Sequence, residues 1–447
     1  MLLGNNHQPS CFHSAILVTC PKNKATLMSP FPLFLPVCQN FPETPLLDIA
    51  ATIAGKFSAI RARIKPGKRI AVGVGSRGIT NLSEIVRATL DQIRSAGGQP
   101  FLIPAMGSHG GATPPGQREV LASYGLTEEA MGVPIHASME VKQVGTSEQG
   151  VPVHCSIEAL AADGIVLINR IKPHTDFTGT LGSGLLKMAV IGLGKRIGAT
   201  AMHVAASRIG HEEAIRGMAR VLLRTTPILG GVAILENQRH ETAGLTVLLG
   251  EDFEERENAL LVEARRLMPL LPFEEIDLLI VDQLGKNISG AGMDPNVINR
   301  SIHGYSSSLL REGQPAPFIR RIFVRGLTPE THGNAIGVGL ADVTTTRLVQ
   351  SMDQRATFIN ALTALTPQSA KAPIHFDTDR ECLERAIDSL ALDDPSTARI
   401  AWIRDTLSLA EMKISEPLWR VVQTQGGLTA AGEARELVFD GEGNLSN

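Results

Sequence analysis

The sequence predicts an α/β protein of two α/β domains, each with a largely parallel or mixed sheet. From residue 69 onward, short apolar runs alternate with segments whose apolar residues recur at helical spacing. A second series of the same kind opens at residue 276, after a break bounded by prolines at 269–272. Many of the 43 glycines and 26 prolines lie in short loops between these segments. Such alternation of strand and helix is typical of sheets covered by helices.

The composition indicates an enzyme for small molecules. The 447 residues suffice for two or three domains with cores of their own, and 43% hydrophobic with 19% charged residues excludes wholesale disorder. A net charge of −3 and 4% aromatic residues argue against nucleic acid as a partner. No apolar run approaches the ~20 residues of a membrane span. The five cysteines form no CxxC pair, so we expect a cytoplasmic protein without disulfides or a zinc knuckle.

The elements follow from apolar periodicity. A helix is expected from residue 82 to 93, with Asn81 as its N-cap and Gly97 at its end. The other elements expected are strands at 69–75, 100–104, 164–169, 228–235, 245–249 and 276–282, helices at 117–124, 212–224 and 252–268, and a hairpin at 139–155.

We place the domain boundary near residue 272, which gives domains at 45–272 and 273–447. Residues 1–44 differ in composition from the rest and are expected to be a disordered tail or an extension. Met28 is an alternative start of the natural chain, which would make residues 1–27 an upstream extension.

The loops after the predicted strands carry the candidate site. In open α/β sheets, ligands bind outside the carboxyl ends of the strands. The loop at 107–113 carries His109, and the loop at 170–176 carries His174. Arg77 follows the first strand. If the strands are parallel, these side chains converge on one edge.

Each of these residues has two interpretations. A loop imidazole that is neutral near physiological pH can act as a general base, and two of them suit a racemase or epimerase. Alternatively, His109 and His174 cap neighbouring helices. The guanidinium group of Arg77 can bind a carboxylate or phosphate through two parallel hydrogen bonds. Alternatively, Arg77 forms a surface salt bridge.

The glycine-rich stretch at 179–195 contains a lysine among apolar residues. It fails the P-loop pattern, and Lys187 occupies the third glycine position of a GxGxxG motif, so no nucleotide fingerprint is present. An apolar site makes the amine of Lys187 a usable nucleophile or attachment point. The alternative is a lysine that reaches solvent from an apolar helix. His203 follows on an alanine-rich helical segment, where a packing role is the simpler interpretation.

These motifs together resemble the nickel-dependent lactate racemase family. The resemblance rests on Gly107–Thr113, on Lys172-Pro-His174, on the glycine-rich run to Lys187, and on His203. It extends over about residues 45–440 and is closest to an uncharacterised branch, which shares Val-Gly-Ser-Arg-Gly-Ile and Gly-Lys-Asn-Ile-Ser-Gly.

The resemblance implies a nickel-pincer nucleotide (nickel pyridinium-3,5-bisthiocarboxylic acid mononucleotide) attached covalently to Lys187, with His203 as the protein ligand to nickel. It implies His109 and His174 as paired bases and Arg77 as the contact to the carboxylate of a 2-hydroxy acid, whose α-hydride passes to the cofactor and returns to the opposite face. Residues 45–272 would bind the cofactor, residues 273–447 would close over the substrate, and the active site would lie in the cleft between them. Enzymes of cofactor synthesis would be partners.

The sequence departs from the family pattern at three places. An aspartate three residues before the arginine is replaced by Val74, and the gap between His174 and Lys187 is longer by a few residues. The second-domain carboxylate contacts are absent, and Asn299 or Arg300 would take their place. A 2-hydroxy acid other than lactate is therefore expected.

Two alternatives remain open at this point. One is an oxidoreductase or lyase that uses the same cofactor without the two-base cycle. The other is a non-catalytic protein that binds a nucleotide or carboxylate through Arg77 and the glycine loops.

Overall fold

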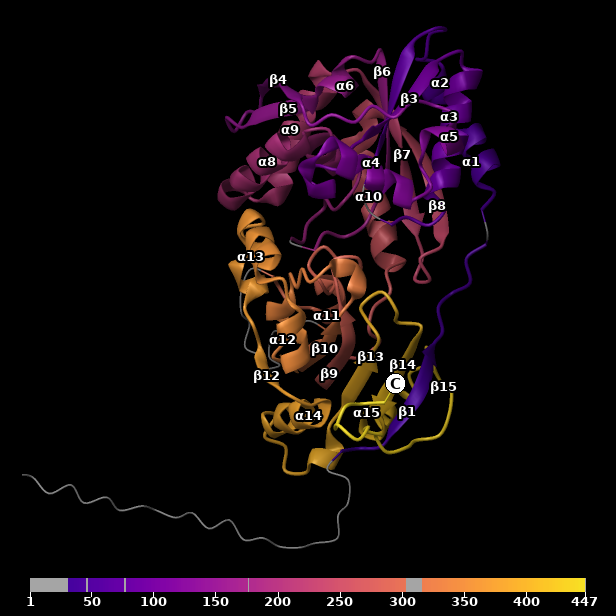
Figure 1. The fold of residues 1–447 in the computed structure, drawn as a ribbon. Helices are drawn as coiled ribbons and strands as arrows, with labels where there is room; N and C mark the ends of the chain where they lie inside the picture. Colours follow the sequence, from indigo (N-terminus) through magenta and orange to yellow (C-terminus); the bar gives the residue numbers. More distant parts are fainter. Residues whose placement is uncertain (1–30, 46, 76–77, 176, 303–315, 447) are drawn as a thin grey trace, which may run out of the picture.

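The computed structural model describes residues 31–45, 47–75, 78–175, 177–302 and 316–446 (Figure 1). Two sheets organise the chain, and Figure 1 shows the first above the second. The α/β fold class predicted from the sequence is confirmed. Within the described ranges, no helix is both long and apolar enough to cross a membrane.

The first sheet has the strand order β3-β2-β6-β7-β8. Strands β3, β2, β6 and β7 are parallel, and β8 runs antiparallel to β7. The parallel strands are buried on both faces, which explains their near-continuous apolar sequence. Their bounds are β2 Arg69–Val74, β3 Gln99–Pro104, β6 Gly164–Arg170, β7 Ile228–Glu236 and β8 Thr242–Leu249.

Helices cover both faces of this sheet, and two apolar clusters form its core. Ala71 and Leu167 face one cluster, and Val72 and Val166, the alternate residues of the same strands, face the other. The helices are α1 Ile49–Lys56, α2 Ser58–Arg61, α3 Leu82–Ser95, α4 Pro114–Ser123, α5 Glu128–Met131, α6 Ile157–Leu160, α7 Leu185–Lys187, α8 Lys195–Ile209, α9 His211–Thr225 and α10 Phe253–Arg266, and the predicted hairpin is β4 Val141–Thr146 with β5 Pro152–Ser156.

The second sheet has the order β12-β11-β10-β9-β13-β14-β1-β15. It is parallel from β12 to β13 and antiparallel from β13 to β15. Its elements are β1 Phe34–Gln39, β9 Glu275–Leu284, α11 Pro295–Ile298, β10 Phe318–Leu327, β11 Val343–Thr345, α12 Thr346–Ser351, α13 Gln354–Thr363, β12 Ile374–Phe376, α14 Asp379–Asp388, β13 Ile400–Ile403, β14 Glu411–Ser415, α15 Glu416–Val422 and β15 Leu428–Ala430.

Strand β1 corrects one expectation for the N-terminal segment. Residues 34–39 lie in the part expected to be a disordered tail or an extension, yet they pair with β14 on one side and β15 on the other. Phe34, Leu35 and Val37 are buried in the second sheet's core. The apolar residues of this short run are ordered because strands from the far end of the chain cover them. The break predicted at 269–272 falls between α10 and β9.

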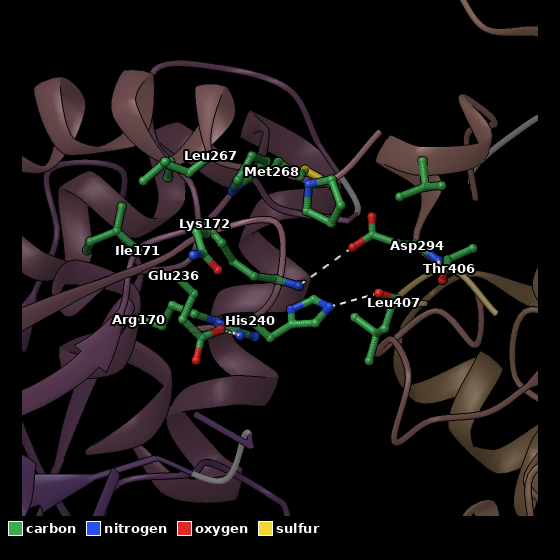
Figure 2. A pocket seen from close by; sticks show the side chains of 15 residues that line it. Arg170, Ile171, Lys172, Glu236, His240, Leu267, Met268, Asp294, Thr406 and Leu407 are labelled. Atoms are coloured by element: carbon green, nitrogen blue, oxygen red, sulfur yellow. Dashed lines mark hydrogen bonds and ion pairs between the residues drawn. The ribbon is translucent and has the colours of Figure 1, made fainter. Parts of the chain in front are cut away.

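Polar contacts join loops of the two sheets (Figure 2). Lys172 Nζ, after β6, lies 3.6 Å from Asp294 Oδ2, which precedes α11. The ring nitrogen Nε2 of His240, in the β7–β8 turn, lies 2.9 Å from the carbonyl oxygen of Leu407. These contacts bring the carboxyl end of β6 beside the second sheet.

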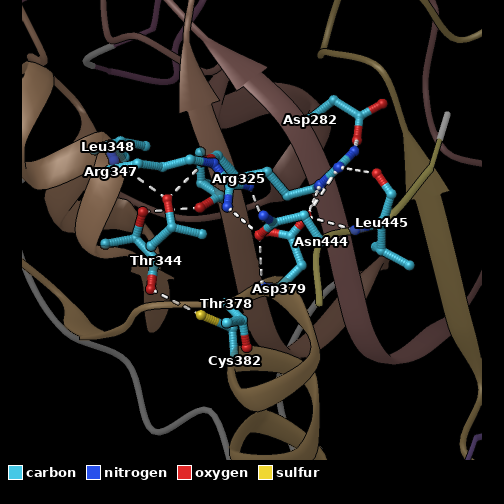
Figure 3. A network of polar contacts seen from close by, with 12 residues as sticks. Asp282, Arg325, Thr344, Arg347, Leu348, Thr378, Asp379, Cys382, Asn444 and Leu445 are labelled. Carbon is cyan, nitrogen blue, oxygen red and sulfur yellow. Dashed lines mark hydrogen bonds and ion pairs between the residues drawn. The ribbon is translucent and has the colours of Figure 1, made fainter. Parts of the chain in front are cut away.

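A buried ionic network fastens the C-terminal segment to the second sheet (Figure 3). Asp379 is fully buried and accepts hydrogen bonds from Arg325 Nε at 2.9 Å, from Arg347, and from the amide of Leu445 at 3.0 Å. Arg325 in turn donates to the carbonyl oxygen of Leu445 at 2.7 Å and pairs with Asp282. Since a buried carboxylate is costly without partners, this network makes residues near 445 part of the folded unit.

Candidate active site

A short bridge brings Lys187 to His174. The backbone of Lys172 exchanges two hydrogen bonds with Ser183, at 3.0 and 2.8 Å. Gly182 permits this approach, because a Cβ atom there would lie 2.3 Å from the carbonyl oxygen of Lys172. The bridge places Lys187 Nζ 2.5 Å from His174 Nε2 and 3.4 Å from Ser183 Oγ.

Lys187 ends α7 at an irregular stretch of helix. A π-helical turn over Met188–Gly192 separates α7 from α8. Such turns are rare and occur frequently at functional sites. The backbone before α7 is held by Asn169, whose Nδ2 donates to the carbonyl oxygen of Gly184 at 2.8 Å.

Glu257, from α10, anchors the first turn of α7. Its Oε1 atom accepts hydrogen bonds from the amides of Leu185 and Leu186, the latter at 3.0 Å. The residue is 3% exposed. Burial raises the pKa of Glu257 to about 7, against the opposing effect of the two amides. A single buried carboxyl group therefore fixes the helix that carries Lys187.

His174 belongs to a group of three histidine rings and one phenylalanine ring. Its ring stacks on Phe177 at 4.5 Å, and Phe177 stacks on His211 at 5.1 Å. His211 lies 6.1 Å from His174 and 6.4 Å from His203, measured between ring centroids.

The surroundings keep His174 neutral. It is 7% exposed, and burial lowers its pKa well below the ordinary value, with further lowering by Lys187, His211 and other nearby cations. A neutral imidazole can accept a proton, as a general base must. Burial therefore favours the neutral form of the His174 ring, which is the form that base chemistry needs.

His203 and His211 lie on adjoining helices. His203 is on α8, and His211 is the first residue of α9. Among the described residues, no group of three or more histidine, cysteine, aspartate or glutamate side chains is placed to hold a metal ion.

His109 lies in the loop that joins β3 to a 3₁₀ turn at Gly110–Ala112. This loop packs on the π-helical turn and on α8, since a Cβ at Gly107 would lie 3.0 Å from Ile191 and 3.8 Å from Ala199. Residue Arg77, the expected carboxylate contact, lies outside the described residues.

A pocket lined in part by residues 170–173, just before His174, lies between loops of the two sheets (Figure 2). It has an empty volume of about 540 Å³, part of it open to solvent. Its polar lining includes Lys172, Asp294 and His240. Asn296, on α11, donates to the carbonyl oxygen of His174 at 3.2 Å and to Asp294 Oδ1 at 2.9 Å. The second sheet thus contacts the loop that carries His174.

Comparison with known proteins finds a family match within the first half of the chain. Residues 54–215 match the family described as the lactate racemase N-terminal domain. The resemblance to the lactate racemase family is confirmed. No curated protein matches the chain.

Two solved structures are similar to this chain over most of its length. The lactate racemase apoprotein from Thermoanaerobacterium thermosaccharolyticum has 13% identity and a TM-score of 0.49, covering 85% of this chain and 99% of that one. A protein from Thermotoga maritima has 13% identity and a TM-score of 0.50, covering 83% of this chain and 99% of that one. At this identity, the second of these similarities supports the fold.

The predicted site residues divide at the end of the lactate racemase match. His109, His174, Lys187 and His203 lie within residues 54–215. Asn299 and Arg300 lie beyond it, in the second half. Their side chains contact other residues of the second half. Asn299 Nδ2 donates to the carbonyl oxygen of Pro317 at 3.4 Å, and Arg300 pairs with Asp342 at 2.8 Å. Their contact with substrate stays a prediction.

Sequence reasoning missed four residues of this candidate site. They are Phe177, His211, Glu257 and Asn296. His211 offered a signal, because it follows Gly210 where a helix begins, but a helical start also suits an ordinary histidine. Glu257 offered none, since a glutamate in a charged helix is usually exposed.

Proposed function

We propose that the protein is an isomerase that racemises or epimerises a 2-hydroxy acid with a nickel-pincer nucleotide attached to Lys187. One observation supports this most directly: in a lactate-racemase-like domain, the amine of Lys187 lies 2.5 Å from a buried, neutral His174. A lysine that serves only to reach solvent would not be placed against a buried imidazole.

The residues present fit such a cofactor. Lys187 offers an amine for covalent attachment, and His203 offers one nitrogen ligand for nickel beside the ring of His211, which in turn lies near His174. When bound, the cofactor would supply the remaining soft ligands to nickel and the hydride-accepting chemistry. The aromatic face of Phe177, stacked between His174 and His211, gives this side of the site an apolar wall.

The protein's own residues handle the protons and the carboxylate. His174 takes the hydroxyl proton of one enantiomer, and His109 takes the hydroxyl proton of the other enantiomer. Loss of that proton and of the α-hydride leaves a flat 2-keto acid, and return of both to the opposite face gives the other enantiomer with no net oxidation. Arg77, with Asn299 or Arg300, would hold the substrate carboxylate.

The division of labour between the halves is part of this proposal. Residues 45–272 would bind the cofactor and carry out the chemistry, while residues 273–447 would close over the substrate. Contacts across the two halves support this arrangement, because Asn296 bonds to the backbone of His174 and Asp294 lies near Lys172.

Mass spectrometry with metal analysis tests the proposal. The protein is produced together with cofactor-synthesis enzymes. The mass of the peptide that contains Lys187 is measured, and the nickel content of the intact protein is determined. We expect a mass addition on Lys187 with stoichiometric nickel, both lost in Lys187→Ala and both kept in Lys56→Ala, a control lysine on α1. An unmodified Lys187 without nickel would refute the proposal.

Turnover distinguishes racemisation from the alternatives. One enantiomer of a candidate 2-hydroxy acid is incubated in D₂O with the loaded enzyme. Racemisation predicts the other enantiomer with its α-hydrogen retained. Accumulation of the keto acid would instead indicate an oxidoreductase.

A further inference from the structure

Two fully buried polar side chains connect α8 to the loop that carries His109. Lys195, the first residue of α8, is 1% exposed, and Gln117, on α4, is 0% exposed. Neither residue belongs to the group around His174. Buried lysine and glutamine are uncommon because removing their polar atoms from water is costly.

The hydrogen bonds of this pair end on one loop. Lys195 Nζ donates to the carbonyl oxygen of Pro104 at 2.5 Å and to Gln117 Oε1 at 3.0 Å. Gln117 Nε2 donates to the carbonyl oxygens of Gly107 at 3.0 Å and His109 at 3.3 Å. The pair therefore holds the loop at three points between the end of β3 and His109.

The backbone around the pair is strained or closely packed. Lys195 has φ +54°, a left-handed conformation that costs a non-glycine residue free energy. A Cβ at Gly192 would lie 2.6 Å from the carbonyl oxygen of Ala105, so the turn before α8 lies directly on the loop backbone. Burial also lowers the pKa of Lys195 to about 8.

The free-energy cost of burying the Lys195 amine and of its left-handed backbone suggests that the lysine has a specific role. A methionine would fill the space of Lys195 without the desolvation of an amine. The lysine instead fixes the His109 loop to α8, the helix that also carries His203 about 12 Å further along. We propose that Lys195 and Gln117 are positioning residues that hold His109 in register with α8; this rests on the proposed role of His109.

Hydrogen exchange on the cofactor-free protein tests the physical link without relying on activity. In Lys195→Met, we expect faster amide exchange in the peptides covering 104–113 and unchanged exchange in β6 and β7. Lys56→Met is the matched control, since Lys56 Nζ also donates to a backbone carbonyl, that of Leu245 at 2.7 Å. Equal exchange at 104–113 in Lys195→Met and the unsubstituted protein would overturn the proposal.

Kinetics of the loaded enzyme test the positioning role. We expect Lys195→Met to keep the mass addition on Lys187 and to lower kcat about 10- to 100-fold with little change in KM, because small misplacements of a catalytic group are costly. Loss of the mass addition in Lys195→Met, or an unchanged kcat, would overturn the proposal.

Gln117→Glu provides a second variant in case Lys195→Met folds poorly. It keeps an acceptor for Lys195 but removes both N–H donors to the loop, so we expect the same faster exchange at 104–113. Full activity of His109→Ala would refute the two-base part of the proposed function. The exchange result would then still decide whether the pair holds the loop.

Discussion

Replacing Glu257 by glutamine should remove one source of pH dependence from the folded protein. Only Oε1 of Glu257 accepts the two amides of α7, and the side-chain oxygen of glutamine can accept the same bonds. Glutamine does not ionise. The variant therefore keeps the anchor of α7 and loses the cost of a buried negative charge.

The direction and size of the effect follow from the pKa. The pKa of Glu257 is raised from 4.5 to about 7, so between these values the native protein retains a proton that the unfolded chain has lost. The stabilising contribution is fully present below about pH 4.5 and is lost as the pH rises to about 7. The difference corresponds to about 3 kcal/mol as an upper figure.

Urea unfolding of the cofactor-free protein between pH 5 and 8 measures this effect. Relative to the unsubstituted protein, Glu257→Gln should gain stability as the pH rises and reach its full advantage above pH 7. Glu433→Gln, at an exposed position, is the control. Parallel pH profiles of stability for Glu257→Gln and the unsubstituted protein would refute the argument.

Three further predictions concern the site and the second sheet. Lys187→Ala should abolish both the mass addition and turnover, whereas His109→Ala should keep the addition and lose turnover; full activity of His109→Ala would contradict the two-base assignment. Gly182→Ala should displace the Lys172–Ser183 bridge, because its Cβ would lie 2.3 Å from a carbonyl oxygen, and should lower kcat well below that of the control Gly55→Ala, which has open space around it. Asp379→Ala should cost about 3 kcal/mol in urea unfolding by breaking a buried ion pair with Arg325, and should speed proteolytic cleavage near residue 445; unchanged cleavage would show that the network does not fasten the C-terminal segment.

Local pattern was sufficient for the buried strands and the main helices. The expected strand at 69–75 corresponds to β2, and the expected helix at 82–93 to α3, because both depend on apolar residues at short range. Asn81 is the N-cap residue of α3 as expected, but it has φ 60° and its side chain makes no cap bond; its Nδ2 donates instead to Thr242 Oγ1 at 3.3 Å. That contact depends on a strand far along the chain.

The site was predictable as a set of residue types but not as an arrangement. Motif spacing selected His174 and Lys187, whereas their contact depends on the bridge between Lys172 and Ser183, which no periodicity reveals. His211 joins the group through stacking on Phe177, and Glu257 joins through its burial under α7. Such contacts arise from tertiary packing, which a single sequence does not encode in a local pattern.

The position of β1 has a consequence for biosynthesis. Because β1 lies between β14 and β15, the segment that forms the first sheet is inserted between β1 and the remaining strands of the second sheet. During translation, the insertion can fold while residues 34–39 still wait for partners that emerge more than 370 residues later. A fragment restricted to residues 275–447 would leave the edges of β14 and β15 unpaired, and unpaired edges promote aggregation. Adding β1 as a separate peptide should reduce that aggregation.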